Sequence, residues 1–154
     1  MWENEIKYVI DLGAAPGGWT GYLLEQSKRV ASVDPATMDD IQPSSDWVHI
    51  QKVSSEAREE LGQFHPTYDL LVCDMNRGPR EAAEFCLQVS DYIRPGGWFI
   101  LTLKLFQKPN KREIRNLKRD MEADLKDQWQ VKDIVWLYAN TLNERTLIAQ
   151  KPLE

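Results

Sequence analysis

A glycine-rich stretch near the start of the chain has the composition of a ligand-binding turn. It reads Asp11-Leu-Gly-Ala-Ala-Pro-Gly-Gly-Trp-Thr20 and joins an apolar predicted strand to a predicted helix. Gly13, Gly17 and Gly18 allow a tight turn and a close approach between backbone and ligand. The free N–H groups at the start of the following helix can bind a carboxylate or a phosphate. A turn that merely connects the two elements is the alternative interpretation.

Acidic residues beside this turn suit a ligand that carries an amine and a ribose diol. Asp11 lies in the first predicted strand, and Asp34 ends the second. The dinucleotide-binding pattern Gly-x-Gly-x-x-Gly occupies the same place in other proteins, but here Ala15 stands where its second glycine belongs and Pro16 follows. This difference disfavours a nicotinamide dinucleotide and favours S-adenosylmethionine, which has both groups.

Three charged residues interrupt or end apolar stretches. Asp74 follows a strongly apolar predicted strand, Lys104 interrupts the apolar run from Phe99 to Phe106, and Glu144 lies between the last two predicted strands. Lysine and aspartate are rarely buried unless they are paired. Because the ends of the fourth and fifth strands of a parallel sheet are adjacent, we expect Asp74 and Lys104 to meet. A purely structural ion pair is the alternative interpretation.

Four motifs in order give the chain a family resemblance. The stretch from Asp11 to Trp19 resembles the cofactor motif of the FtsJ/RrmJ family of ribose 2′-O-methyltransferases. The later motifs are similar to the methyltransferase half of the RlmM branch, which methylates a cytidine ribose of ribosomal RNA. They read Ser32-Val-Asp-Pro-Ala-Thr-Met38, Val72-Cys-Asp-Met75 and Leu103-Lys-Leu105. The resemblance runs from about Val9 to the C-terminus.

The resemblance implies an S-adenosylmethionine-dependent enzyme that methylates a ribose 2′-hydroxyl of RNA, with ribosomal RNA as the expected substrate. Asp74, Lys104 and Glu144 match the second, third and fourth members of the family's Lys-Asp-Lys-Glu tetrad. The hydroxyl proton must leave and the developing charge must be stabilised, and a lysine oriented by two carboxylates can do either. No metal is expected, because the cofactor carries a good leaving group. The implied cofactor contacts are Asp11, Gly13, Ala14, Pro16, Gly17, Gly18, Trp19, Asp34 and Asp74.

The chain departs from the family pattern in two places. The family's first lysine lies well upstream of the glycine motif, whereas only ten residues precede Asp11 here, and Lys7 lies too close. The interpretations are a missing N-terminal segment, an RNA-binding partner, catalysis by three residues, or a catalytically weak or inactive S-adenosylmethionine-binding module within a larger assembly. The acidic residue that relatives place near the adenine is also absent, and Gln51 or Ser54 can replace its contact.

A cluster of basic residues follows the predicted catalytic lysine. Its members are Lys108, Lys111, Arg112, Arg115, Lys118 and Arg119. The solvated face of a surface helix explains such a cluster as well as RNA does. Its position beside Lys104 favours RNA, and we expect phosphate contacts from Lys108, Lys111, Arg112 and Arg115. Arg77 and Arg80 are candidates to extend this strip.

Predicted strands and helices alternate along almost the whole chain. The predicted strands are Lys7–Leu12, Arg29–Val33, Trp47–Ile50, Tyr68–Cys73, Trp98–Leu105, Val131–Leu137 and Thr146–Gln150. The predicted helices cover about Trp19–Gln26, Ser54–Gly62, Pro79–Ile93 and Lys111–Lys126, and a turn is expected over Arg94–Gly97. This pattern predicts an α/β fold with a Rossmann-like, doubly wound, mostly parallel seven-stranded sheet. Two consecutive strands at the end predict a C-terminal antiparallel hairpin.

Composition narrows the class of protein further. A chain of 154 residues fits a single domain over 1–154, and its net charge of -5 argues against nonspecific coating of nucleic acid. No apolar run is long enough to cross a bilayer, and the N-terminus does not resemble a signal peptide, so we expect no membrane partner and a cytoplasmic location. Cys73 and Cys86 are expected to be buried free thiols. The oligomeric state is left open.

Overall fold

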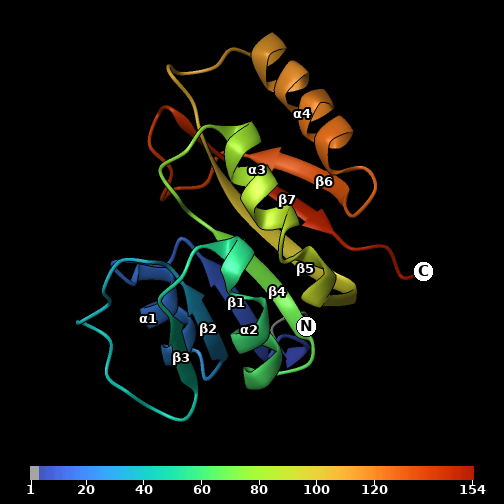
Figure 1. Ribbon diagram of the computed structural model, residues 1–154. Coiled ribbons are helices and arrows are strands. Elements are labelled where there is room, and N and C mark those ends of the chain that lie inside the picture. The colour runs from blue at the N-terminus through green and yellow to red at the C-terminus, as the bar shows by residue number, and fades with distance from the viewer. Residues whose placement is uncertain (1–3) are drawn as a thin grey trace.

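The computed structural model describes residues 4–154 and contains a seven-stranded sheet with helices packed on both faces (Figure 1). The strands are β1 (Tyr8–Leu12), β2 (Arg29–Val33), β3 (Trp47–Ile50), β4 (Tyr68–Cys73), β5 (Ile93–Lys104), β6 (Gln130–Val135) and β7 (Glu144–Gln150). The helices are α1 (Gly18–Glu25), α2 (Arg58–Phe64), α3 (Pro79–Leu87) and α4 (Lys111–Leu125). Two 3₁₀ turns, η2 (Ser54–Glu56) and η3 (Ser90–Tyr92), complete the described elements.

The strands follow the order β3-β2-β1-β4-β5-β7-β6. Strands β1 to β5 pair in parallel, whereas β7 pairs antiparallel with both β5 and β6. The predicted doubly wound sheet with a C-terminal antiparallel hairpin is therefore confirmed. The order reverses between β1 and β4, and open sheets of this kind bind ligands in the crevice beyond the carboxyl ends of such strands.

Two apolar layers hold the sheet. On one face, Leu23 of α1 belongs to a buried cluster with Val9, Val30, Leu70 and Val72. On the other face, α2, α3 and α4 cover a larger buried cluster that includes Cys73 and Cys86, both of which are free thiols. The central strands are buried on both faces, which explains their almost continuous apolar sequences.

The third predicted helix is shorter than its apolar spacing indicated. Helix α3 ends at Leu87 instead of Ile93, and η3 follows. The buried hydroxyl of Ser90 donates to the Cys86 carbonyl at 2.9 Å and accepts from the Trp129 indole N–H at 2.9 Å. A serine side chain that binds a nearby carbonyl competes with the helical hydrogen bonds, and this contact with Trp129 is invisible in the local sequence.

The predicted turn over Arg94–Gly97 is wrong, because this segment is a bulged part of β5. The register against β4 shifts between Tyr68 and Leu70. The Gly96 N–H donates to the Lys151 carbonyl at 3.1 Å, and the Lys151 N–H donates to the Gly97 carbonyl at 2.8 Å. Pairing with the C-terminal segment therefore keeps both glycines in the sheet, and a positive φ of 77° at Gly96 accommodates the bulge.

Candidate active site

Lys104 lies between two carboxylates at the carboxyl edge of the sheet. Its Nζ is 2.7 Å from Asp74 Oδ1 and 3.0 Å from Glu144 Oε1. Asp74 directly follows β4, Lys104 is the last residue of β5, and Glu144 is the first residue of β7. The structure thus brings together three residues that lie far apart in the sequence. The meeting of Asp74 and Lys104 was expected from adjacent strand ends, whereas the place of Glu144 beside them was implied only by the family resemblance.

The sheet register fixes the position of Glu144. Strand β7 begins two residues earlier than the predicted Thr146, because Lys104 and Glu144 are opposite partners in the antiparallel ladder. One oxygen of Glu144 accepts from Lys104, and the other accepts from the Thr141 N–H at 3.1 Å. Both oxygens are therefore engaged, so Glu144 is a rigid support for the lysine.

The ion pairs keep Lys104 charged. Partial burial by itself lowers the pKa of Lys104, but hydrogen bonds to Asp74 and Glu144 outweigh it, and the net pKa is raised. Burial by itself raises the pKa of Glu144, but the Thr141 N–H and Lys104 outweigh it, and the net pKa is lowered. The Lys104 side chain is 26% exposed, so a ligand can reach it. Such an ammonium can stabilise negative charge on a substrate oxygen.

Glycine conformations shape the turn between β1 and α1. Gly13 has a φ of 71°, and a Cβ added there would lie 2.8 Å from Met75 Cβ. Gly17 has a φ of 128°. The Gly13 N–H donates to the Val33 carbonyl at 2.8 Å, which ties the turn to the end of β2. These positions accept no other residue without strain, so the turn is built for close backbone contact.

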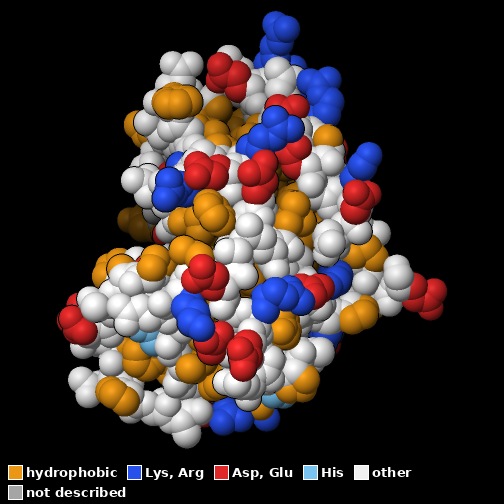
Figure 2. Space-filling view, viewed as in Figure 1, with side chains coloured by type: hydrophobic (Ala, Val, Ile, Leu, Met, Phe, Trp, Pro, Cys, Tyr) orange, Lys and Arg blue, Asp and Glu red, His pale blue; other side chains and the backbone are white. Residues whose placement is uncertain are grey.

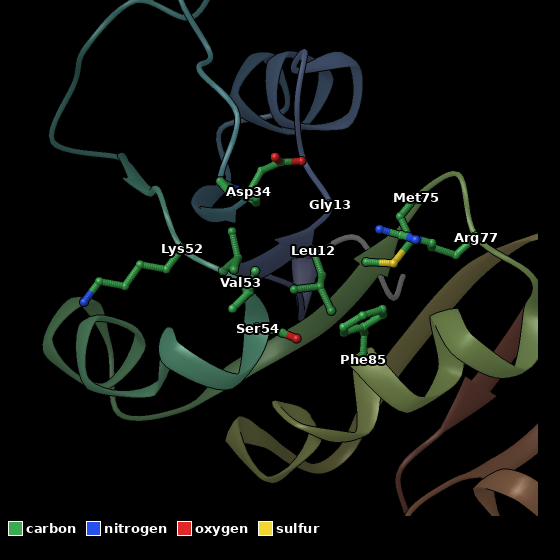
Figure 3. A pocket seen from close by; sticks show the side chains of 11 residues that line it. Leu12, Gly13, Asp34, Lys52, Val53, Ser54, Met75, Arg77 and Phe85 are labelled. Atoms are coloured by element: carbon green, nitrogen blue, oxygen red, sulfur yellow. The ribbon is translucent and has the colours of Figure 1, made fainter.

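A pocket of about 210 Å³ opens beside this turn (Figure 3). It is lined by Leu12, Gly13, Val33, Asp34, Pro35, Lys52, Val53, Ser54, Met75, Arg77 and Phe85. Two expected cofactor residues, Gly13 and Asp34, therefore border it. The Asp34 carboxylate also accepts from the Ala15 N–H at 3.1 Å and the Ala36 N–H at 2.8 Å.

Most of the pocket wall was not predicted from the sequence. Val53 and Met75 could have been predicted from their positions. They follow the ends of β3 and β4, and ligands bind beyond such strand ends. Phe85 lies on α3 and could not have been predicted in this way. Of the two candidate adenine contacts, Ser54 lines the pocket, whereas the Gln51 amide donates to the Pro35 carbonyl at 3.2 Å and is not among the lining residues.

Lys104 with its partners Asp74 and Glu144 is called the lysine cluster below. A second, more open hollow lies between the turn and this cluster. It is lined by Gly18, Trp19, Tyr22 and Asp74. The rings of Trp19 and Tyr22 meet edge to face, with centroids 6.5 Å apart. Three of the expected cofactor residues thus border this hollow, and Asp74 also contacts Lys104. The expected residues Ala14, Pro16 and Gly17 lie in the turn but line neither hollow.

Asp11 is set apart from the other expected cofactor residues. It is 1% exposed, and its Oδ2 accepts from the Thr20 hydroxyl at 2.7 Å. The hydroxyls of Thr20 and Ser32 are 2.6 Å apart, and the Trp47 indole N–H donates to Ser32 at 2.9 Å. Burial raises the pKa of Asp11 to about 7, although bonds from Thr20 oppose the shift. The carboxyl group supports the turn from inside the protein.

The four expected RNA contacts lie beyond the end of β5. Lys108, Lys111, Arg112 and Arg115 are exposed, and none forms an ion pair with another of residues 4–154. Helix α4 begins there with a capping box, in which Asn110 and Glu113 each accept from the other's N–H at 2.9 and 2.8 Å. By contrast, Arg77 pairs with Glu81, and Arg80 pairs with Asp124.

Two general features complete the description of residues 4–154. These residues contain no cluster of three or more His, Cys, Asp or Glu side chains placed to hold a metal ion. None of their helices has both the length and the apolar character needed to cross a membrane. The single-domain organisation and the cytoplasmic location stay predictions.

The strand order and the glycine turn after β1 define a Rossmann-like fold. Fibrillarin pre-rRNA processing protein of Methanococcus jannaschii shares the fold, with a TM-score of 0.78 and 12% identity over 100% of this chain and 70% of that chain. A sequence model of the FtsJ-like methyltransferase family matches residues 1–126. This chain belongs to that family, which confirms the resemblance in its motifs and the expectation of a methyltransferase.

Two relatives are similar to this chain in sequence, and a further structure shares its fold. An uncharacterised protein of Methanocaldococcus jannaschii is 30% identical over 98% of this chain and 42% of its own length. Ribosomal RNA large subunit methyltransferase M of Histophilus somni is 33% identical over 81% of this chain and 34% of its own length. Aeropyrum pernix fibrillarin, solved with bound S-adenosyl-L-methionine, has a TM-score of 0.66 at 18% identity over 93% of this chain and 66% of that chain. The chain thus spans less than half the length of the Methanocaldococcus jannaschii and Histophilus somni relatives.

Proposed function

We propose that this chain transfers the methyl group of S-adenosylmethionine to a ribose 2′-hydroxyl of RNA. The observation that carries the proposal is the Lys104 ammonium, held by Asp74 and Glu144 beside the glycine turn. The bound cofactor of Aeropyrum pernix fibrillarin supports the choice of methyl donor. The name of the Histophilus somni relative supports ribosomal RNA as the acceptor.

The pocket beside the turn fits an adenosine group. Gly13 leaves room for close backbone contact, because any side chain there would collide with Met75. The Asp34 oxygens keep lone pairs for ribose hydroxyls beyond the two backbone bonds that they accept. Val53, Met75 and Phe85 would contact the purine ring. When bound, the cofactor would supply an electrophilic methyl group on its sulfonium, with a neutral thioether as the leaving group.

Lys104 acts on the acceptor oxygen. A bound cofactor would supply its methyl group to the ribose oxygen and would keep the carbon–sulfur electron pair as a neutral thioether. Lys104 donates a hydrogen bond to that oxygen and stabilises the charge that develops there. An ammonium held between two carboxylates suits this role rather than proton abstraction. The hydroxyl proton leaves to Asp74, which is the more exposed carboxylate at 41%, and passes from there to water.

The exposed cations at the start of α4 would bind RNA phosphates. Lys111 and Arg112 occupy its first turn, where the helix dipole disfavours positive charge by about 0.3–1 kcal/mol per residue. Cations in this place do not serve helix stability, which favours a role in binding an anion. We therefore assign phosphate contacts to these two residues together with Lys108 and Arg115.

Methyl transfer to RNA by a Lys104→Ala variant tests the proposal. The wild-type chain, supplied with labelled cofactor and ribosomal RNA, is expected to yield 2′-O-methylated nucleosides in mass spectrometry. The variant should lose about a hundredfold or more in rate, because it lacks the charge at the acceptor oxygen. Calorimetric affinity for the cofactor should change little. Lys132→Ala, an exposed position on the edge strand β6, is the matched control.

Each outcome of this assay is decisive. Equal rates for Lys104→Ala and the wild-type chain would overturn the mechanism. Methylation on a base would overturn the choice of acceptor. Cofactor binding without turnover on naked RNA or on ribosomal particles would favour a binding module that acts within a larger assembly.

A further inference from the structure

Exposed apolar side chains gather in two loops at the edge of the sheet that holds Lys104. Eight large apolar side chains are exposed among residues 4–154, and five lie in segments 105–110 and 136–143. These five are Phe106, Trp136, Leu137, Tyr138 and Leu142. We call Phe106, Trp136 and Tyr138 the aromatic rim. Large exposed apolar groups that cluster in this way mark contact surfaces.

Backbone bonds hold the two loops together beside the lysine cluster. The Leu105 N–H donates to the Asn143 carbonyl at 2.9 Å, and the Asn143 amide donates to the Phe106 carbonyl at 3.5 Å. These contacts continue the ladder directly beyond the paired residues Lys104 and Glu144. Figure 1 shows the connections β5–α4 and β6–β7 at the same edge of the sheet. The aromatic rim therefore borders the proposed site of methyl transfer.

The three rings are available to a ligand. Phe106 and Tyr138 are fully exposed, so neither contributes to the core. Trp136 is 55% exposed and is held in place: the Arg145 guanidinium lies 5.2 Å from its ring centroid, and its indole N–H donates to the Asn140 carbonyl at 3.4 Å. Flat rings presented in this way can stack on the faces of unpaired bases.

The side chains near the aromatic rim are mainly basic, which suits the phosphates of RNA rather than an apolar protein surface. Residues 104–119 include seven basic residues and one acidic residue, whereas the rest of the chain has twelve basic and twenty-three acidic residues. Figure 2 shows blue side chains over the first turns of α4, with orange side chains beside them. The cores of protein interfaces are depleted in lysine, but aromatic rings beside a basic surface are typical of single-stranded RNA binding.

We propose that the aromatic rim stacks on bases next to the target nucleotide, so that the substrate segment is single-stranded or locally unstacked RNA. This inference rests on the proposed function and specifies the state of its substrate. An A-form duplex displays its 2′-hydroxyls in a shallow groove while its bases stay stacked inside. An enzyme for duplex RNA would therefore need no exposed rings at this place.

Binding of a short RNA tests the inference without any need for turnover. The probe is an unstructured RNA oligonucleotide that contains the fluorescent base 2-aminopurine, and the comparison is its duplex with the complementary strand. The wild-type chain should quench the probe and bind the single strand more tightly than the duplex. Phe106→Ala and Tyr138→Ala should each weaken single-strand binding about tenfold and reduce the quenching, whereas duplex and cofactor binding stay unchanged.

Leucine and aromatic replacements separate stacking from apolar contact. Phe106→Trp and Tyr138→Phe should restore binding, whereas Phe106→Leu should not. Wild-type RNA affinity in Phe106→Leu would overturn stacking, because a side chain without a ring would then bind the single strand equally well. Equal losses on single strand and duplex, or no RNA binding by the wild-type chain, would also overturn the inference. Ring-dependent binding without ribose methylation would instead refute the proposed function, but it would still support base stacking by the aromatic rim.

Discussion

Replacing Asp11 by asparagine is expected to remove a pH dependence from the stability of the fold. Burial raises the pKa of Asp11 from its ordinary value of 3.8 to about 7. Between these values the folded chain holds a proton that the unfolded chain has released. The group's contribution to stability is therefore complete below pH 3.8 and is lost as the pH rises through about 7.

The size of the effect follows from the pKa difference. Each pH unit within this window changes the free energy of unfolding by about 1.4 kcal/mol. From pH 5 to pH 8.5 the wild-type chain should lose about 3 kcal/mol through this group, because the loss accumulates only up to about pH 7. Asparagine keeps an oxygen for the Thr20 hydroxyl and does not ionise. The variant should match the wild type at pH 5 and exceed its stability at pH 8.5.

Urea unfolding at the two pH values measures this difference. The transition is followed by circular dichroism, and equal m-values show that the comparison is between the same states. Asp39→Asn, an exposed position in the loop after β2, is the control and should not change the pH dependence. A stability difference between Asp11→Asn and the wild type that is the same at pH 5 and pH 8.5 would refute the reasoning.

Two further predictions concern the turn and the lysine cluster. Gly13→Ala should cost about 1–3 kcal/mol of stability and most of the cofactor affinity, because φ is positive and Met75 lies 2.8 Å from the added Cβ. Gly21→Ala in helix α1 should instead stabilise the fold by about 0.5–1 kcal/mol, because the added Cβ would lie 3.7 Å from its nearest neighbour. Thermal unfolding measures the stability of the two variants, and calorimetry measures their cofactor affinity. Equal effects of the two substitutions would contradict this reasoning. Glu144→Gln should move the alkaline loss of methyl transfer to lower pH, because Lys104 loses one of the two carboxylates that raise its pKa. Single-turnover rates measured against pH report this shift, and an unchanged or higher midpoint would exclude it.

The sequence by itself determined the parts of this protein that depend on local pattern. Alternating apolar strands and amphipathic helices predict the doubly wound sheet, and the glycines at 13 and 17 predict a turn that tolerates positive φ. Asp74 and Lys104 were recognisable because charged residues at the end or in the middle of apolar runs need a partner. Parallel neighbours place strand ends together, so their meeting at 2.7 Å was predictable.

Tertiary structure alone decided the features that depend on contacts between distant segments. Phe85 reaches the pocket from α3. The Trp129 indole N–H donates to the Ser90 hydroxyl just beyond the end of α3. The register of β5 with β7 puts Glu144 opposite Lys104. Asp11 stays a predicted cofactor contact, and only the tertiary structure shows that it is buried and bonded to the Thr20 hydroxyl. Side-chain burial and register depend on how elements far apart in the chain pack together. A local pattern carries no record of that packing, so these contacts could not be derived from it, and only the family resemblance pointed to Glu144.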